Sequence, residues 1–195
     1  EYSMERKKFL WGIGNVGEGV VTMVTSTYFM IFLTDTALLP LWMVSLISIT
    51  GSVLDFFLVP LSGVLLDSVR FTRWGRYRSW LLVCPPLVVL FYVLCFTVTG
   101  SVATTALCAL LGYLGGKAAW NLVYSANVTL TAILSREDKI GTKFTSQKMI
   151  GSNLGRMLGN ALTPALVSAF AVHMNEAASY QVTILVLGSF YIASS

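Results

Sequence analysis

Long apolar stretches separated by short polar clusters recur along the whole chain. Cutting at those clusters predicts helices at 9–34, 40–67, 79–98, 103–134, 144–172 and 178–195. All but the last reach the ~20 residues that a helix needs to cross a bilayer. The chain is 55% hydrophobic and only 11% charged, against about 25% charged residues in soluble proteins. The pattern predicts an all-α integral membrane protein with six spans, the sixth cut short.

Basic residues cluster in alternate connections between these predicted helices. Three precede the first helix, four lie between the second and third, and three lie between the fourth and fifth: Arg6, Lys7, Lys8, Arg70, Arg73, Arg76, Arg78, Arg136, Lys139 and Lys143. The other three connections carry no Lys or Arg. By the positive-inside rule we expect a multi-pass membrane protein with a cytoplasmic N-terminus. A bacterial inner membrane is the membrane that we expect. This distribution explains the net charge of +4 without a nucleic-acid partner.

Four charged residues fall well inside predicted spans at about the same depth. Glu18, Asp55, Lys117 and Arg156 each lie about 18–25 Å from one end of their helix. A charge at mid-bilayer costs about 2.5–3.5 kcal/mol on the insertion scale. These side chains are therefore expected to face inward and to pair.

Polar residues at helical spacing accompany the charges and predict a solvated cleft. The stripes on the first, fourth and fifth helices supply the candidate solute-binding residues, which are Glu18, Thr22, Trp120, Asn121, Tyr124, Lys148, Ser152 and Arg156. The alternative is that the four charged residues form buried ion pairs whose role is to fix helix register. Four charges at one depth favour a solute pathway instead.

Other features carry less functional information. The ladder of Gly151, Gly155 and Gly159 is typical of close helix packing. No connection contains a nucleophile–base set, metal-ligand spacing or a phosphate loop. An enzyme is therefore the least favoured class, and we expect no cofactor and no metal site.

Several segments resemble one family of transporters, in order along the chain. They are WGIGNVGEG, FLTDTALLP, LDFFLVPLSG, GVLLDSVRFTRWGRYRSWLL and TKFTSQKMIGSNLG. They are similar to the major facilitator superfamily, in the form of the glycoside-pentoside-hexuronide:cation symporters that include melibiose permease. The resemblance implies two six-helix halves with solute bound between them and alternating access. The chain would be the N-terminal half, partnered by a C-terminal six-helix half or a second copy.

The resemblance also implies roles for particular residues. Asp55 matches a carboxylate that helps bind the coupling cation, and Asn121 stands where another oxygen ligand is common. Leu58 and Val59 replace an amide and a second carboxylate, so a sodium site would lack ligands. We expect the Lys117 ammonium to reach Asp55 and replace the metal ion as a tethered cation.

Two further contacts follow from the family arrangement. The first and fifth helices are neighbours in that fold, so Glu18 is expected to pair with Arg156 or Lys148. In the superfamily, the acid at the inner end of the second helix and the arginines behind it brace the two halves. This implies a conformational latch built from Asp67, Arg73 and Arg76.

Together these features predict a secondary active transporter of a small polar solute, anionic or glycoside-like. Proton coupling, through protonation of Asp55, or no coupling is favoured over sodium coupling. The alternatives are a non-transporting receptor or scaffold that keeps the fold, and a natural half-transporter that acts as a dimer.

Overall fold

The computed structural model describes residues 2–68, 78–137 and 141–194. The described part is built of helices and contains no strand. The first predicted helix is one continuous helical run made of α1 (Tyr2–Met23), η1 (Val24–Tyr28), α2 (Phe29–Ile31) and η2 (Phe32–Thr36). The remaining helices are α3 (Leu41–Ser68), α4 (Arg78–Cys95), α5 (Val102–Glu137), α6 (Gly141–Ala171) and α7 (Glu176–Ser194). A helix therefore occupies each predicted range, and the prediction of an all-α membrane fold is confirmed.

Four of the described helices are long and apolar enough to cross a membrane. They are Phe9–Thr36, Leu41–Ser68, Val102–Ile133 and Glu176–Ser194. Ser79–Cys95 is a shorter apolar helix, and α6 is long enough at 31 residues but more polar. The chain is thus a multi-pass membrane protein, while the count of six spans stays a prediction.

Two π-helical turns, η1 and η2, interrupt the first helix, which the apolar pattern alone predicts as regular. Threonine hydroxyls bond back to carbonyls of the preceding turn beside η1. Thr22 Oγ1 donates to Glu18 O at 2.7 Å, and Thr25 Oγ1 donates to Val21 O at 2.9 Å. Such back-bonding competes with the regular ladder. A π-helical turn holds an extra residue and changes which side chains face a given direction.

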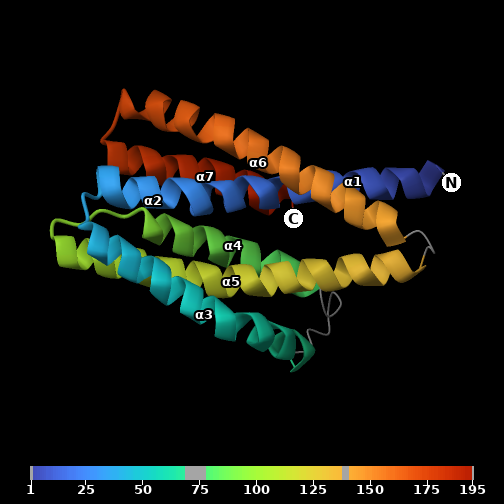
Figure 1. Cartoon of the computed structure of the whole chain (residues 1–195). Coiled ribbons are helices and arrows are strands. Elements are labelled where there is room, and N and C mark those ends of the chain that lie inside the picture. The colour runs from blue at the N-terminus through green and yellow to red at the C-terminus, as the bar shows by residue number, and fades with distance from the viewer. Residues whose placement is uncertain (1, 69–77, 138–140, 195) are drawn as a thin grey trace.

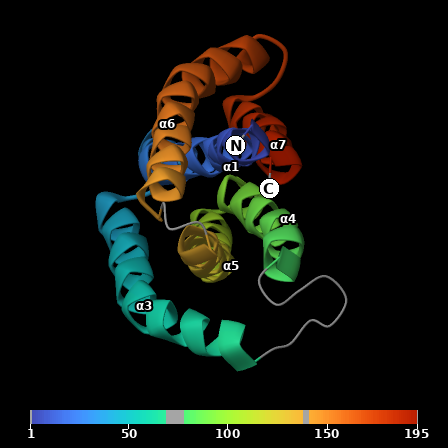
Figure 2. The ribbon, with the colours of Figure 1, turned by 90° about the vertical axis from the view of Figure 1, so that its right-hand side faces the viewer.

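The helices run alongside one another and pack in a definite order (Figure 1). α6 packs against α1, and both α3 and α4 pack against α5. α7 contacts α1, α4 and α6. In the end-on view, α3 lies at one edge of the bundle beside α5, and α6 lies at another edge beyond α1 (Figure 2).

An aromatic cluster forms the core near the end where α4 stops and α7 starts. Phe29 stacks on Tyr113 with ring centroids 4.8 Å apart. Phe32 lies 4.8 Å from Phe96 and 5.3 Å from Tyr180. Rings from α2, η2, α5 and α7 thus meet with Phe96, which directly follows α4. Rings at these separations attract beyond the area that they bury. The cluster fixes the helices that surround the site described below.

The contact between α1 and α6 has little room for side chains. A Cβ atom at Gly151 would overlap the carbonyl oxygen of Gly12, and one at Gly155 would overlap that of Val16. At Gly159 it would lie 3.1 Å from the carbonyl oxygen of Val20. The predicted small-residue ladder is therefore confirmed as a site of close backbone approach.

Candidate functional site

A pocket of about 400 Å³ lies among the helices, and we call it the central pocket. Its wall comes from the first helical run and from α3, α4 and α5. The lining residues are Thr22, Thr25, Ser26, Met30, Asp55, Tyr92, Tyr113, Lys117, Trp120, Asn121 and Tyr124. The pocket combines hydroxyls, aromatic rings and one pair of opposite charges in an apolar bundle. Its volume is within the range of small-molecule sites.

The charges in this wall form the ion pair that the sequence predicts. Lys117 Nζ donates to Asp55 Oδ2, and Asn121 Nδ2 donates to Asp55 Oδ1 at 2.9 Å. We call these three residues the Asp55 triad. Lys117 and Asn121 lie one turn apart on α5, so both reach the single carboxylate on α3. The predicted contact between Asp55 and Lys117 is therefore confirmed.

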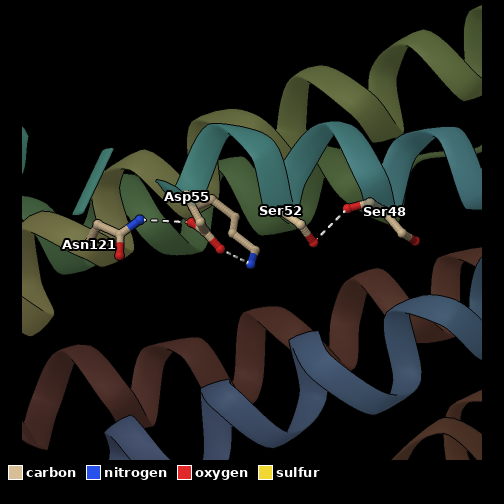
Figure 3. A network of polar contacts seen from close by, with 5 residues as sticks. Ser48, Ser52, Asp55 and Asn121 are labelled. Atoms are coloured by element: carbon tan, nitrogen blue, oxygen red, sulfur yellow. Dashed lines mark hydrogen bonds and ion pairs between the residues drawn. The ribbon is translucent and has the colours of Figure 1, made fainter. Parts of the chain in front are cut away.

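Figure 3 shows Asp55 and Asn121 turned toward each other, with Ser52 and Ser48 further along α3. The side chains of Asp55 and Lys117 are 29% and 26% exposed, so the pair is partly solvated at the pocket surface. The Lys117 nitrogen also lies 5.3 Å from the centre of the Tyr113 ring, within cation–π range. The Asp55 carboxylate and the Tyr113 ring together compensate the lysine charge, while the Asn121 amide stabilises the carboxylate.

Half of the predicted solute-binding residues line the central pocket and half do not. Thr22, Trp120, Asn121 and Tyr124 belong to its wall. The other four lie outside the lining set; they are Glu18, Lys148, Ser152 and Arg156. The separation has a steric cause, because the glycines of α1 and α6 bring the two backbones into contact. The Ser152 carbonyl oxygen, for example, fills the space where Gly19 would carry a Cβ.

Glu18 is held by the amide of Asn127 rather than by a direct ion pair. It is 7% exposed, and Asn127 Nδ2 donates to Glu18 Oε2 at 2.7 Å and to Asn15 Oδ1 at 2.8 Å. Asn15 Nδ2 in turn donates to Trp11 O at 2.7 Å. We call Asn15, Glu18 and Asn127 the amide network. It joins α1 to α5 through buried polar groups.

The expected ion pair of Glu18 with Lys148 or Arg156 is not formed. Within the described ranges, neither cation lies within 4.0 Å of the Glu18 carboxylate, although both interact with it electrostatically. The Lys148 nitrogen instead lies 5.1 Å from the centre of the Tyr124 ring. Arg156 is exposed on α6. Close approach of α1 and α6 leaves long side chains no room between them, so these cations extend around the contact.

Sequence reasoning missed Asn127 and part of the pocket wall. Asn127 lies three residues after Tyr124, so the helical stripe of α5 contained the signal. The regular helical stripe did not include Thr25, because the π-helical turn η1 turns this side chain toward the pocket together with Ser26. Tyr92 carried no signal, since the α4 segment has no polar stripe.

The predicted latch is only partly within the described residues. Asp67 is exposed near the end of α3. Arg73 and Arg76 fall outside the described ranges, so the contact among the three stays a prediction.

The described residues show no ligand set for a metal ion. They contain no group of three or more His, Cys, Asp or Glu side chains that could hold one. At the two positions where cation ligands would be expected from the family, Leu58 is half-buried and Val59 is 56% exposed. Both offer only hydrocarbon, whereas hard cations require several oxygens.

Comparison with known proteins identifies the family. A family model described as MFS/sugar transport protein matches residues 10–194. The chain belongs to this family. The resemblance to the major facilitator superfamily is therefore confirmed over nearly the whole chain.

Individual relatives within the family are distant. An uncharacterized symporter, YnaJ, of Bacillus subtilis is 24% identical over 93% of the chain and 40% of its own length. The sodium-dependent lysophosphatidylcholine symporter 1 of Xenopus tropicalis is 25% identical over 91% of the chain and 35% of its own length. An isoprimeverose transporter of Lactiplantibacillus pentosus is 29% identical over 84% of the chain and 34% of its own length. The chain spans two fifths or less of these relatives.

Proposed function

We propose that this chain is the N-terminal part of a secondary active transporter, which moves a small polar solute by alternating access. The observation that carries the proposal is the Asp55 triad in the wall of a pocket of about 400 Å³. Charged residues inside a membrane are costly and mark solute or ion pathways. An ion pair that served packing alone would need no pocket beside it.

The solute is anionic or glycoside-like. Trp120, Tyr113 and Tyr124 offer ring faces, while the hydroxyls of Thr22, Thr25 and Ser26 offer hydrogen bonds. Lys117 adds a cation that an anionic group can approach. One relative is named for isoprimeverose and another for lysophosphatidylcholine, so both sugars and lipid-like solutes are reasonable probes.

Transport is coupled to protons or uncoupled, rather than coupled to sodium. The Lys117 ammonium pairs with Asp55, which matches the carboxylate that binds the coupling cation in the family. Lys117 therefore takes the place of that cation, as a positive charge tethered to the chain. Leu58 and Val59 leave no oxygen at two further ligand positions. One relative is named as sodium-dependent, which makes the coupling ion a direct point of test.

The remaining half of the pathway comes from a C-terminal six-helix half or from a second copy of the chain. We propose that the N-terminus and the two connections that follow the second and fourth predicted helices lie on the cytoplasmic side of a bacterial inner membrane. The basic residues of these segments support that orientation through the positive-inside rule.

Flux measurements on the full-length protein in proteoliposomes test the proposal. A neutral glycoside, a hexuronide and lysophosphatidylcholine serve as probes, under imposed proton or sodium gradients. We expect uptake of at least one probe above protein-free vesicles, with no stimulation by sodium at fixed pH and membrane potential. Binding without flux would favour a receptor or scaffold. A clear sodium stimulation would show that ligands from elsewhere complete a sodium site.

A further inference from the structure

Two carboxylates lie inside the helical bundle in contrasting surroundings. Asp55 has the ammonium of Lys117 as its ion-pair partner, and it is 29% exposed. Glu18 is 7% exposed and accepts its hydrogen bond from a neutral amide, that of Asn127. Among the described residues, no Lys or Arg nitrogen lies within 4.0 Å of Glu18. The more deeply buried acid is therefore the one without a direct counter-charge.

Each helix packed against this part of α1 supplies a known set of groups. α6 supplies Lys148 and Arg156, which act on the Glu18 carboxylate only from beyond ion-pair distance. α5 supplies the amide of Asn127. α7 supplies Tyr191 beside Gly17, one residue from Glu18. The Lys148 ammonium also makes a cation–π contact with the Tyr124 ring.

This arrangement favours proton binding at Glu18. An ionised carboxylate that is buried without an ion pair loses its hydration and regains only part of it from amides. Taking up a proton removes that cost. Asp55, by contrast, has a charged partner in direct contact, the Lys117 ammonium.

We infer that Glu18 is a proton-binding site, separate from the Asp55 triad. Its protonation removes the negative charge that acts on Lys148 and Arg156, so their positive charges favour an anionic solute group beside Tyr124. One proton from water binds a carboxylate oxygen, and the local charge rises by one. Tyr124 lines the central pocket and lies against Lys148, so the added positive charge adjoins the solute space. The link to the solute rests on the proposed function; the proton site does not.

Proton and anion then bind cooperatively. Binding an anion near Lys148 offsets the charge that protonation of Glu18 adds, and the coupling must be reciprocal. The full-length protein is therefore expected to bind an anionic probe more tightly at lower pH.

Infrared difference spectroscopy of the full-length protein, without any solute, tests the proton site. Spectra recorded between about pH 5 and about pH 9 cover titration of a buried carboxyl. We expect a protonated-carboxyl band in the wild type that is absent from Glu18→Gln. Glu176→Gln is the matched control, because Glu176 is exposed and bonds only Thr36 among the described residues. It should keep the band. A band of unchanged size in Glu18→Gln, or one that Asp55→Asn removes instead, would overturn the inference.

A second variant keeps the test decisive if Glu18→Gln does not fold. Lys148→Gln removes one of the two cations that act on Glu18, so the band should be stronger at a given pH than in the wild type. An unchanged band in Lys148→Gln would contradict the assignment. The infrared test uses no solute, so it does not depend on transport. An absent band would count against the Glu18 site, whereas absent flux in proteoliposomes would count against the proposed transporter.

Discussion

At the scale of single residues, the molecule stabilises charges inside the membrane in two different ways. Lys117 and Asp55 neutralise each other at the pocket surface, whereas Glu18 depends on the amide of Asn127, which also bonds Asn15. An ion pair removed from water repays its desolvation only when both partners are present. The pair should therefore respond to mutation as a unit.

Single and double substitutions of the pair test this dependence. Asp55→Asn and Lys117→Met should each destabilise the full-length protein by about 3 kcal/mol, the lower end of the range for a buried pair, because each leaves one charge unpaired. The double variant should cost less than either single change. Thermal unfolding in detergent measures stability, and flux measures function. Additive losses in the double variant would show that the two residues act independently.

At the scale of helices, the site depends on how closely α1 and α6 approach. The glycine ladder of α6 lets backbone meet backbone, and this contact keeps Ser152 and Arg156 out of the pocket wall. Van der Waals packing drives helix association in lipid, so small residues carry most of the contact.

Adding a single methyl group should disturb this interface. Gly155→Ala places a Cβ against the carbonyl oxygen of Val16 and should cost about 1–3 kcal/mol, as overpacking does. Gly63→Ala on α3 is the matched control, because its Cβ would meet nothing within 4 Å. It should leave stability unchanged or raise it by up to about 1 kcal/mol, through better helix propensity. Equal melting temperatures for the two variants would argue against a tight α1–α6 contact.

At the scale of the whole molecule, the open question is what holds one conformation of the transport cycle. We predict that Asp67, exposed near the end of α3, braces the two halves together with Arg73 and Arg76. Positive charge alone would satisfy membrane topology, so only a latch requires the acid. Asp67→Asn should shift the balance between outward-open and inward-open states and lower the flux. Cysteine accessibility from each side of the membrane reports that balance. An unchanged balance and flux at normal expression would refute the latch.

The sequence by itself determined the membrane class and the helix positions, because the length of apolar runs and the cost of charge in lipid are local properties. The family came from the resemblance of several segments in order along the chain, and the pairing of Asp55 with Lys117 followed from that resemblance. Only the tertiary structure decided that Asn127 holds Glu18, that Lys148 lies on Tyr124 and that Thr25 faces the central pocket. Those contacts depend on the π-helical turn at η1 and on how close α1 and α6 come. The approach of α1 and α6 arises from packing between segments far apart in the chain.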